Sequence, residues 1–224
     1  MTYTERNISL PCLCLVIDNV GTDTDSLTKV VSLAIDGGVN MVQLRAKELP
    51  LNQFKEVAIL LRDLVGSKAI LMINSRADVA ASCGADGVQF SEKSKDVSRL
   101  RKVNKKLLIG SSVHSVNSAV LAEKNGADFL IVGTVFESTS HPGLRTQGIE
   151  LLTKVKDAVQ IPFLGIGGIK ATNADQVLEC GASGVALISA ILDNPDPKMA
   201  AQEIYEAILR KWARPNWITK NILL

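Results

Sequence analysis

Short apolar runs alternate along this chain with longer stretches in which apolar residues recur at helical spacing. In residues 26–36, for example, the apolar side chains fall on one face of a helix; they are Leu27, Val30, Val31, Ala34 and Ile35. The apolar runs are rich in β-branched residues and are typical of buried strands; they cover residues 12–18, 40–45, 69–74, 86–90, 107–112, 128–133, 161–166 and 184–188. The alternation predicts eight strands, each followed by a helix.

Several of the predicted helices end at a glycine just before the next strand. The glycines of 36–38 (DGG), 83–85 (CGA), 125–127 (NGA) and 180–182 (CGA) stand where a left-handed helix C-cap is expected. Each strand returns through a helix, so the sheet is predicted to be parallel. An open doubly wound sheet and a closed barrel both fit this alternation. The eight units and the absence of a GxGxxG motif after the first strand favour a single α/β domain, a (β/α)8 (TIM) barrel over about residues 12–212.

The segment after the last predicted helix differs from the rest of the chain. Residues 213–224 contain Pro215, which ends the helix, then Trp217 and four isoleucine or leucine residues. This tail is compatible with packing under the barrel, with a subunit interface or with disorder. No change of composition marks a second domain among the 224 residues.

The composition excludes several classes of protein. Hydrophobic residues make up 46% and charged residues 21%, which argues against global disorder. The net charge of +2 and the 4% of aromatic residues argue against a nucleic-acid partner. No apolar run approaches the ~20 residues of a membrane span, and the N-terminus lacks the apolar core of a signal peptide. We therefore expect a cytoplasmic protein without a membrane partner, whose four cysteines, lacking zinc-ligand spacing, are buried thiols.

Two cations follow the second predicted strand. Gln43, Arg45 and Lys47 alternate, so they point to the same side at the C-terminal end of the barrel, where TIM barrels carry their active sites. Like charges held together are costly unless an anion neutralises them. The spacing predicts a phosphate or carboxylate ligand, with structural salt bridges as the alternative.

The ends of the last two strands predict a phosphate site. Gly167 and Gly168 follow the seventh strand and let the backbone approach a ligand, with N–H groups at the start of a helix. Ile188 and Ser189 end the eighth strand, and Ser189 adds a hydroxyl and its own N–H. The loops after strands 7 and 8 form the usual phosphate site of this fold.

The best acid–base candidate is a histidine. His114 follows the fifth strand, after Ser112, and Ser115 is placed to cap the next helix. A histidine at this edge suits proton transfer near neutral pH. His141 lies in the loop after the sixth strand, where contact with substrate and simple solvation both stay open.

The third strand ends in a further pair of polar residues. Asn74 is placed to hydrogen-bond a ligand, and Ser75 to cap the following helix. A divalent metal ion needs several oxygen ligands, usually with carboxylates among them. The acidic residues near the mouth on strands 3, 4 and 6 are Glu92, Asp96 and Glu137 alone, so we predict no dedicated metal site.

Seven segments together resemble the thiamine phosphate synthase/TenI superfamily over about residues 13–191. They are 43–47 (QLRAK), 74–76 (NSR), 110–115 (GSSVHS), 126–130 (GADFL), 133–137 (GTVFE), 165–169 (GIGGI) and 185–191 (VALISAI). In this superfamily, thiamine phosphate synthases join a pyrimidine pyrophosphate to a thiazole phosphate with Mg²⁺. TenI-type tautomerases aromatise a thiazole phosphate carboxylate without metal.

The chain departs from the synthase pattern at three places. Ser75 replaces the aspartate of the synthase Asn-Asp-Arg motif, which binds Mg²⁺, and Ser94 aligns with a second aspartate. Residues 138–141 (STSH) replace a Thr-x-Thr-Lys motif. These departures resemble TenI. The resemblance therefore implies a thiazole tautomerase, an isomerase without cofactor.

In that interpretation His114 is the acid–base residue. The thiazole phosphate substrate contacts residues that follow several strands: Gln43, Arg45, Lys47, Asn74, Ser112, Ser138 and Ser140. The phosphate group of the substrate contacts residues that follow the last two strands: Gly167, Gly168, Ile188 and Ser189.

Two alternatives stay open. The first is a divergent thiamine phosphate synthase, which joins hydroxymethylpyrimidine pyrophosphate and thiazole phosphate with Mg²⁺ held by Glu92 or Asp96. The second is a non-catalytic regulator that binds a thiazole or thiamine phosphate. Barrels of this superfamily tend to form homo-oligomers, and the apolar tail is compatible with a dimer.

Overall fold

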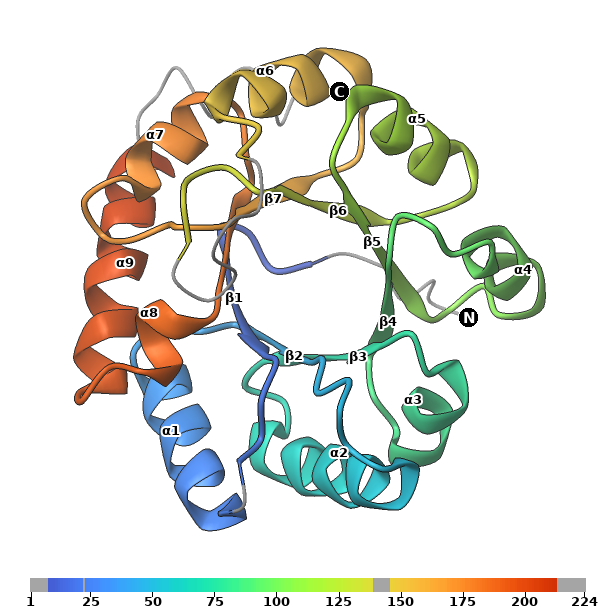
Figure 1. Cartoon of the computed structure of the whole chain (residues 1–224), viewed down its shortest axis with the longest axis vertical. Helices are drawn as coiled ribbons and strands as arrows, with labels where there is room; N and C mark the ends of the chain where they lie inside the picture. Colours follow the sequence, from blue (N-terminus) through green and yellow to red (C-terminus); the bar gives the residue numbers. More distant parts are fainter. Residues whose placement is uncertain (1–7, 22, 139–145, 213–224) are drawn as a thin grey trace.

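A computed structural model of the chain describes residues 8–21, 23–138 and 146–212. Its eight parallel strands pair in sequence order, and β8 pairs with β1, so they form a closed barrel (Figure 1). The strands are β1 (Cys12–Ile17), β2 (Met41–Leu44), β3 (Ile70–Asn74), β4 (Gly87–Phe90), β5 (Leu108–Val113), β6 (Phe129–Gly133), β7 (Phe163–Ile166) and β8 (Gly184–Leu187). The predicted TIM barrel is confirmed, and each predicted strand boundary agrees within two residues.

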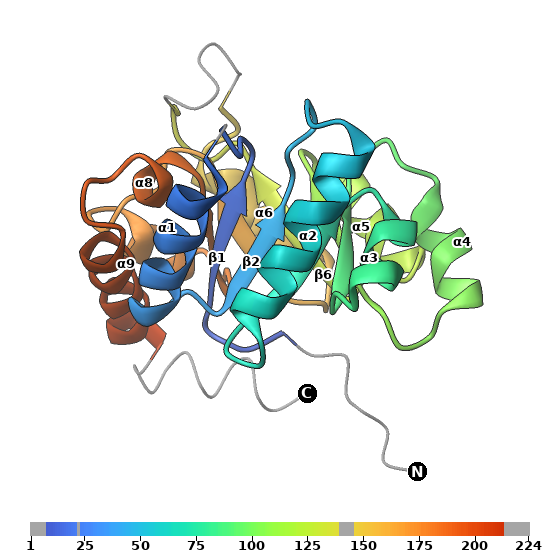
Figure 2. The ribbon, with the colours of Figure 1, turned by 90° about the horizontal axis from the view of Figure 1, so that it is seen from below.

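Helices surround the barrel and follow each strand in the chain (Figures 1 and 2). They are α1 (Thr24–Asp36), α2 (Leu51–Val65), α3 (Ala77–Cys83), α4 (Asp96–Val103), α5 (Val116–Lys124), α6 (Ile149–Ala158), α7 (Ala174–Glu179), α8 (Ser189–Leu192) and α9 (Pro197–Trp212). The last of them, α9, packs against α1 and α7 and completes the ring. None of these helices is long and apolar enough to span a membrane. The tail at 213–224 lies outside the described residues.

The core has two layers because successive strand side chains point to opposite faces. On β1, Cys12 and Cys14 face the barrel interior, whereas Leu13 and Leu15 face the helices. The two interior cysteines are fully buried, and burial raises the pKa of the Cys14 thiol to about 12. The buried-thiol interpretation holds for this pair. It is wrong for the other two cysteines, Cys83 and Cys180, which are only half-buried because they lie at helix ends.

A glycine with positive φ ends each of the four helices α1, α3, α5 and α7, as predicted. Gly84 is the left-handed C-cap of α3, with a φ of 68°, as predicted. After α1, Gly37 has a φ of −86°, and Gly38, the second glycine of the predicted segment, takes the positive φ of 111°. Gly126 and Gly181 have positive φ one residue beyond the caps of α5 and α7.

Two aspartates brace the N-terminal end of the barrel. Asp86 precedes β4, and its Oδ2 accepts the backbone N–H of Leu71 on β3 at 2.7 Å and the Arg62 guanidinium at 2.8 Å. Asp128 precedes β6, and its Oδ2 accepts the N–H of Ile109 on β5 at 2.7 Å and the guanidinium of Arg101. Each carboxylate therefore joins a strand start to its neighbour and to a helix.

Candidate active site

A cavity of about 910 Å³ opens at the C-terminal end of the barrel. It collects every predicted site residue that the structure describes: Gln43, Arg45, Lys47, Asn74, Ser112, His114, Ser138, Gly167, Gly168, Ile188 and Ser189. Ser140 and His141 lie outside the described residues. Because side chains from β2, β3, β5, β7 and β8 line one space, the cavity fits the site that the strand ends predict.

One wall of the cavity carries hydrogen-bonded amides and hydroxyls. The Gln43 Nε2 donates to Asn74 Oδ1 at 3.3 Å, and the Asn74 Nδ2 donates to Ser75 Oγ at 3.1 Å. Behind this wall, the Gln89 Nε2 donates to Ser112 Oγ at 3.0 Å. Gln43 and Gln89 are buried, so these bonds satisfy side-chain N–H groups that would otherwise be expensive to desolvate, although the Gln89 Oε1 has no hydrogen-bond partner in the described ranges.

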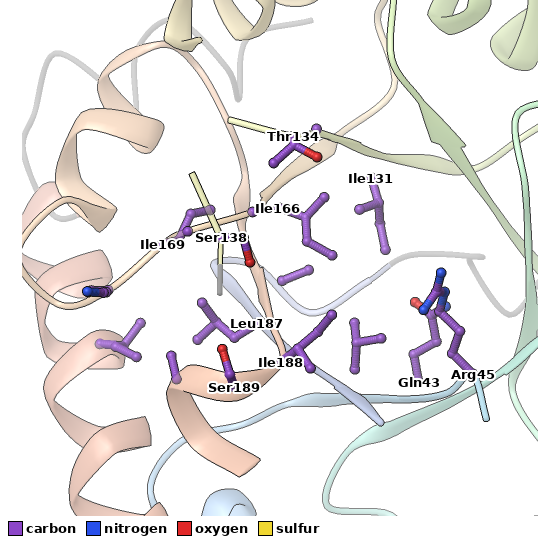
Figure 3. A pocket seen from close by; sticks show the side chains of 18 of the residues that line it. Gln43, Arg45, Ile131, Thr134, Ser138, Ile166, Ile169, Leu187, Ile188 and Ser189 are labelled. Atoms are coloured by element: carbon purple, nitrogen blue, oxygen red, sulfur yellow. The ribbon is translucent and has the colours of Figure 1, made fainter. Parts of the chain in front are cut away.

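The two predicted cations lie at the end of this wall. Arg45 projects into the cavity beside Gln43, and Lys47 lines it from the following loop (Figure 3). In the described ranges, no carboxylate or hydrogen-bond acceptor contacts either side chain. Arg76, by contrast, lies over the Phe54 ring at 5.1 Å from its centroid and does not line the cavity. Arg45 and Lys47 are therefore available to an anionic ligand.

Glycines shape the opposite wall. Gly167 and Gly168 have φ values of 104° and 63°, which disfavour a side chain. A Cβ on Gly168 would lie 2.2 Å from the Glu137 carbonyl oxygen, and one on Gly167 would lie 2.4 Å from Thr134 Cγ2. These glycines are thus required first by the close packing of the loops after β6 and β7. In the described part of the chain no acceptor engages their N–H groups, which remain available to a ligand.

The two walls face each other across an apolar floor. Figure 3 shows Gln43 and Arg45 on one side, and Ser138 and Ser189 on the other. The side chains between them are aliphatic and come from β6 and β7 and from the end of β8; they are Ile131, Ile166 and Ile188. Such a floor can contact aromatic rings, while the walls hold polar or charged groups.

His114 pairs with a carboxylate that its own strand does not supply. The Nδ1 of His114 lies 3.0 Å from Glu92 Oε2, and its backbone N–H donates to Glu92 Oε1 at 3.2 Å. Partial burial would raise the pKa of the Glu92 carboxyl, but hydrogen bonds from the Ser118 hydroxyl and from His114 outweigh it and lower that pKa below its usual value. Glu92 therefore orients the imidazole of His114 through Nδ1, and the Nε2 of His114 takes no part in this contact.

The predicted helix caps near the site differ in outcome. Ser115 caps α5 as predicted, because its Oγ accepts the Ser118 N–H at 3.1 Å. The prediction for Ser75 is wrong: α3 begins after Arg76, and no side chain caps it. Ser75 instead has a φ of 61°, a left-handed conformation that no other non-glycine residue adopts in the described ranges.

The residues at the site do not fit a Mg²⁺ ion. Ser94 and Asp96 do not line the cavity. The Ser94 Oγ donates instead to Asp96 Oδ2 at 3.0 Å at the start of α4. Within the described ranges, no three or more histidine, cysteine, aspartate or glutamate side chains form a group that could hold a metal ion. The predicted absence of a dedicated metal site stays a prediction. It rests on the finding that few carboxylates of the described residues line the cavity close to one another.

Sequence reasoning missed part of the cavity lining. Thr134 and Lys170 line it, and both follow strand ends, β6 and the GIGGI segment, so position alone could have identified them. Glu203 and Ile204 also line it from α9. These two residues had no local signal, because α9 reaches the mouth only through the closure of the ring.

Comparisons with known proteins agree with this geometry. A family model described as thiamine monophosphate synthase matches residues 13–191. The thiamine-phosphate synthase of Pyrococcus furiosus is 36% identical over 176 residues, 78% of this chain and 85% of that protein. The thiamine-phosphate synthase of Clostridium botulinum strain Hall is 38% identical over 195 residues, 86% of this chain and 95% of that protein.

A solved structure gives the same result. Thiamine phosphate pyrophosphorylase from Pyrococcus furiosus superposes with a TM-score of 0.80 at 33% identity, over 89% of this chain and 96% of that one. These relatives are named as synthases, which are transferases. The interpretation as a thiazole tautomerase, an isomerase, is therefore wrong: it gave more weight to the departures at Ser75, Ser94 and residues 138–141 than to the overall match. The chain belongs to the thiamine monophosphate synthase family.

Proposed function

We propose that this chain is a transferase that joins hydroxymethylpyrimidine pyrophosphate to thiazole phosphate and releases pyrophosphate. In this reaction the thiazole ring nitrogen attacks the methylene carbon of the pyrimidine. The bond from that carbon to the diphosphate oxygen breaks, and diphosphate leaves with the electron pair. The names of relatives at 36–38% identity support the proposal.

One observation carries the proposal from the structure itself. The cavity has two separate places suited to anions, the cations after β2 and the glycine loop after β7, on opposite sides of an apolar floor. A reaction between two phosphorylated rings needs such an arrangement, because both anions must bind while the rings meet. Holding the two reactants together lowers the entropic part of the barrier.

The proposal gives each wall a substrate. The phosphate of thiazole phosphate binds the N–H groups of Gly167 and Gly168 and the loop at Ile188 and Ser189. The pyrimidine ring, whose nitrogens and amino group are hydrogen-bonding partners, lies against the amide and hydroxyl wall formed by Gln43, Asn74 and Ser112. Ser138 lines the side of the phosphate loop.

The charge that develops on the leaving diphosphate determines the roles of the ionic groups. Arg45 and Lys47 stabilise that charge, and preorganised cations of this kind contribute most in the transition state. The reaction abstracts no proton from carbon, so it does not need a base. His114, oriented by Glu92, is instead placed to donate a hydrogen bond to the departing oxygen.

The test offers purified protein both substrates, in Mg²⁺ and, separately, in a chelator, and measures thiamine phosphate by chromatography. We expect product that requires both substrates and increases linearly with enzyme. A Gly84→Ala variant, altered at a helix cap away from the cavity, serves as the control that retains activity. Absence of product in both buffers contradicts the proposal.

Three further expectations belong with this proposal. The substrates are small molecules, in agreement with the family. A cytoplasmic location and self-association into a homo-oligomer stay predictions. Size-exclusion chromatography with light scattering tests the self-association.

A further inference from the structure

We infer that this chain binds the diphosphate of its substrate through side-chain cations and does not depend on a divalent metal ion. The inference rests on the proposed transferase function and concerns how the diphosphate charge is met. Diphosphate carries several negative charges, which proteins neutralise with a carboxylate-bound cation or with arginine and lysine. The metal-ligating groups at the ends of β3 and β4 decide whether a bound metal ion or the side-chain cations neutralise the diphosphate.

The end of β3 offers only neutral donors. Asn74 and Ser75 line the cavity there, and the Asn74 amide already bonds to Gln43 on one side and Ser75 on the other. Neutral oxygens can complete the shell of a hard cation but cannot balance its charge. This strand end therefore supplies no anchor for a metal.

The end of β4 supplies one carboxylate, and it has another partner. Both oxygens of Glu92 face His114, one toward its backbone N–H and one toward its ring. The neighbouring Asp96 accepts from the Ser94 hydroxyl at the start of α4 and does not line the cavity. A metal at this strand end would compete with His114 for the oxygens of Glu92.

The remaining acidic residues of the cavity lie elsewhere. Glu137 follows β6, Asp193 caps α8 and Glu203 belongs to α9. None of them joins Glu92 in a cluster of metal-ligating side chains in the parts of the chain that the structure describes. The carboxylates are thus dispersed around the mouth.

Two cations of the cavity lie together at the end of β2. Arg45 and Lys47 enter the cavity two residues apart, without an ionic partner in the described ranges. A guanidinium can donate two parallel hydrogen bonds to phosphate oxygens, and an ammonium adds a mobile charge. This pair can meet the diphosphate directly.

Calorimetric titration with inorganic pyrophosphate tests the inference without turnover. We expect the wild-type dissociation constant to change less than threefold between excess EDTA and millimolar Mg²⁺. Arg45→Gln is expected to weaken binding at least tenfold in both buffers, whereas Arg99→Gln, which removes an exposed charge on α4, leaves it unchanged. Binding that requires Mg²⁺, or that is equally tight in Arg45→Gln, overturns the inference.

A second variant introduces the missing charge. Ser75→Asp places a carboxylate at the cavity in a left-handed conformation that aspartate tolerates better than most residues. We expect this variant to bind pyrophosphate at least tenfold more weakly than wild type in EDTA, and to regain affinity in Mg²⁺. If wild type and Ser75→Asp respond equally to Mg²⁺, the serine has no influence on metal use and the inference fails.

The turnover assay separates this inference from the function on which it rests. Product in EDTA at a rate within threefold of that in Mg²⁺ supports both. Product only in Mg²⁺ leaves the transferase function intact and overturns metal independence. If neither buffer gives product, the proposed function fails, and the pyrophosphate titrations still decide whether the cations bind diphosphate without metal.

Discussion

At the N-terminal end of the barrel, Arg62 and Arg101 each contact an aspartate, whereas Arg45 and Lys47 at the C-terminal end contact no carboxylate in the described ranges. We call the N-terminal end of the barrel the paired end, because Arg62 and Arg101 there join strands to helices by hydrogen bonds within the chain. We call the C-terminal end the unpaired end, because Arg45 and Lys47 there line a cavity and keep their hydrogen-bonding capacity for a ligand. Charge therefore serves stability at one end of the barrel and recognition at the other.

The same contrast appears in the glycines. Gly84 caps α3 with room for a Cβ, so its glycine serves the backbone turn alone. Gly168 has a similar φ, 63° against 68°, but lies against the loop after β6 and lines the cavity. Matched substitutions at the two ends can therefore separate folding from ligand binding.

The largest effect is expected at the paired end. Asp128→Ala removes the carboxylate that accepts hydrogen bonds from the Arg101 guanidinium and from the Ile109 backbone N–H. The side chains of Asp128 and Arg101 are largely shielded from water. Breaking such a pair leaves a buried charge, so we expect the free energy of unfolding to fall by about 3 kcal/mol. Urea titration followed by circular dichroism measures it.

Asp86→Ala is the matched control for this loss. Asp86 has the same contacts, but its side chain is 46% exposed, against 11% for Asp128. Water can replace part of its contribution, so we expect a decrease of about 1 kcal/mol. Equal losses in the two variants would mean that burial does not set the strength of these braces.

The next effect belongs to the unpaired end. Arg45→Gln removes the charge-assisted bonds to the leaving diphosphate, which are worth roughly 1.5–3 kcal/mol. We expect kcat/KM to fall about 100-fold, since each factor of ten corresponds to about 1.4 kcal/mol. The free energy of unfolding should be unchanged, because Arg45 has no partner in the described ranges to lose. A marked loss of stability would show that Arg45 braces the fold.

A smaller effect is expected from the glycine pair. Gly168→Ala forces a Cβ against the Glu137 carbonyl and displaces the phosphate loop, so we expect the KM for thiazole phosphate to rise roughly tenfold. Gly84→Ala places the same side chain in the same conformation without a clash, at a cost of about 1–2 kcal/mol in stability. Steady-state kinetics of both variants distinguish the two roles. A KM unchanged in Gly168→Ala would exclude this loop from phosphate binding.

The fold was predictable because its signals are local. Alternation of apolar runs with helical stretches gave strand boundaries to within two residues, and Gly84 predicted a helix cap correctly. Gly37, which does not itself take the left-handed conformation, is required for a tertiary reason: a Cβ there would lie 2.4 Å from the Lys198 carbonyl on α9. That glycine is explained by packing between distant segments, which no local pattern contains.

The site was predictable only as far as strand ends determine it. Position at a strand end identified Arg45, His114 and Gly168, because the topology brings these ends together. The pairing of Glu92 with His114 joins residues 22 positions apart and depends on how two loops fold. The activity was predicted wrongly from the departures at Ser75, Ser94 and residues 138–141; Ser75 lines the cavity and Ser94 does not.

The smallest effect concerns the contact between Glu92 and His114 at the active-site mouth, which is an ion pair when the imidazole is protonated. Contacts with Ser118 and His114 lower the pKa of Glu92 in the folded state, so the ionised carboxylate stabilises the fold. This contribution is fully present above the ordinary pKa of about 4.5 and is lost as the pH falls through the lowered value. Half of the His114 side chain is exposed, so the pair resembles a surface ion pair worth under about 1 kcal/mol.

Glu92→Gln should therefore lower the melting temperature by roughly 1–3 °C at pH 7, and the difference from wild type should vanish near pH 3. Scanning calorimetry at both pH values checks this, with Glu56→Gln on the exposed face of α2 as the control. The same variant should lower kcat, because the imidazole loses the carboxylate that orients it. A difference in melting temperature that persists at pH 3 would mean that Glu92 acts through packing. The contact between Glu92 and His114 would then add nothing to the free energy of unfolding as an ion pair, in contrast to the Asp128 and Arg101 pair at the N-terminal end of the barrel.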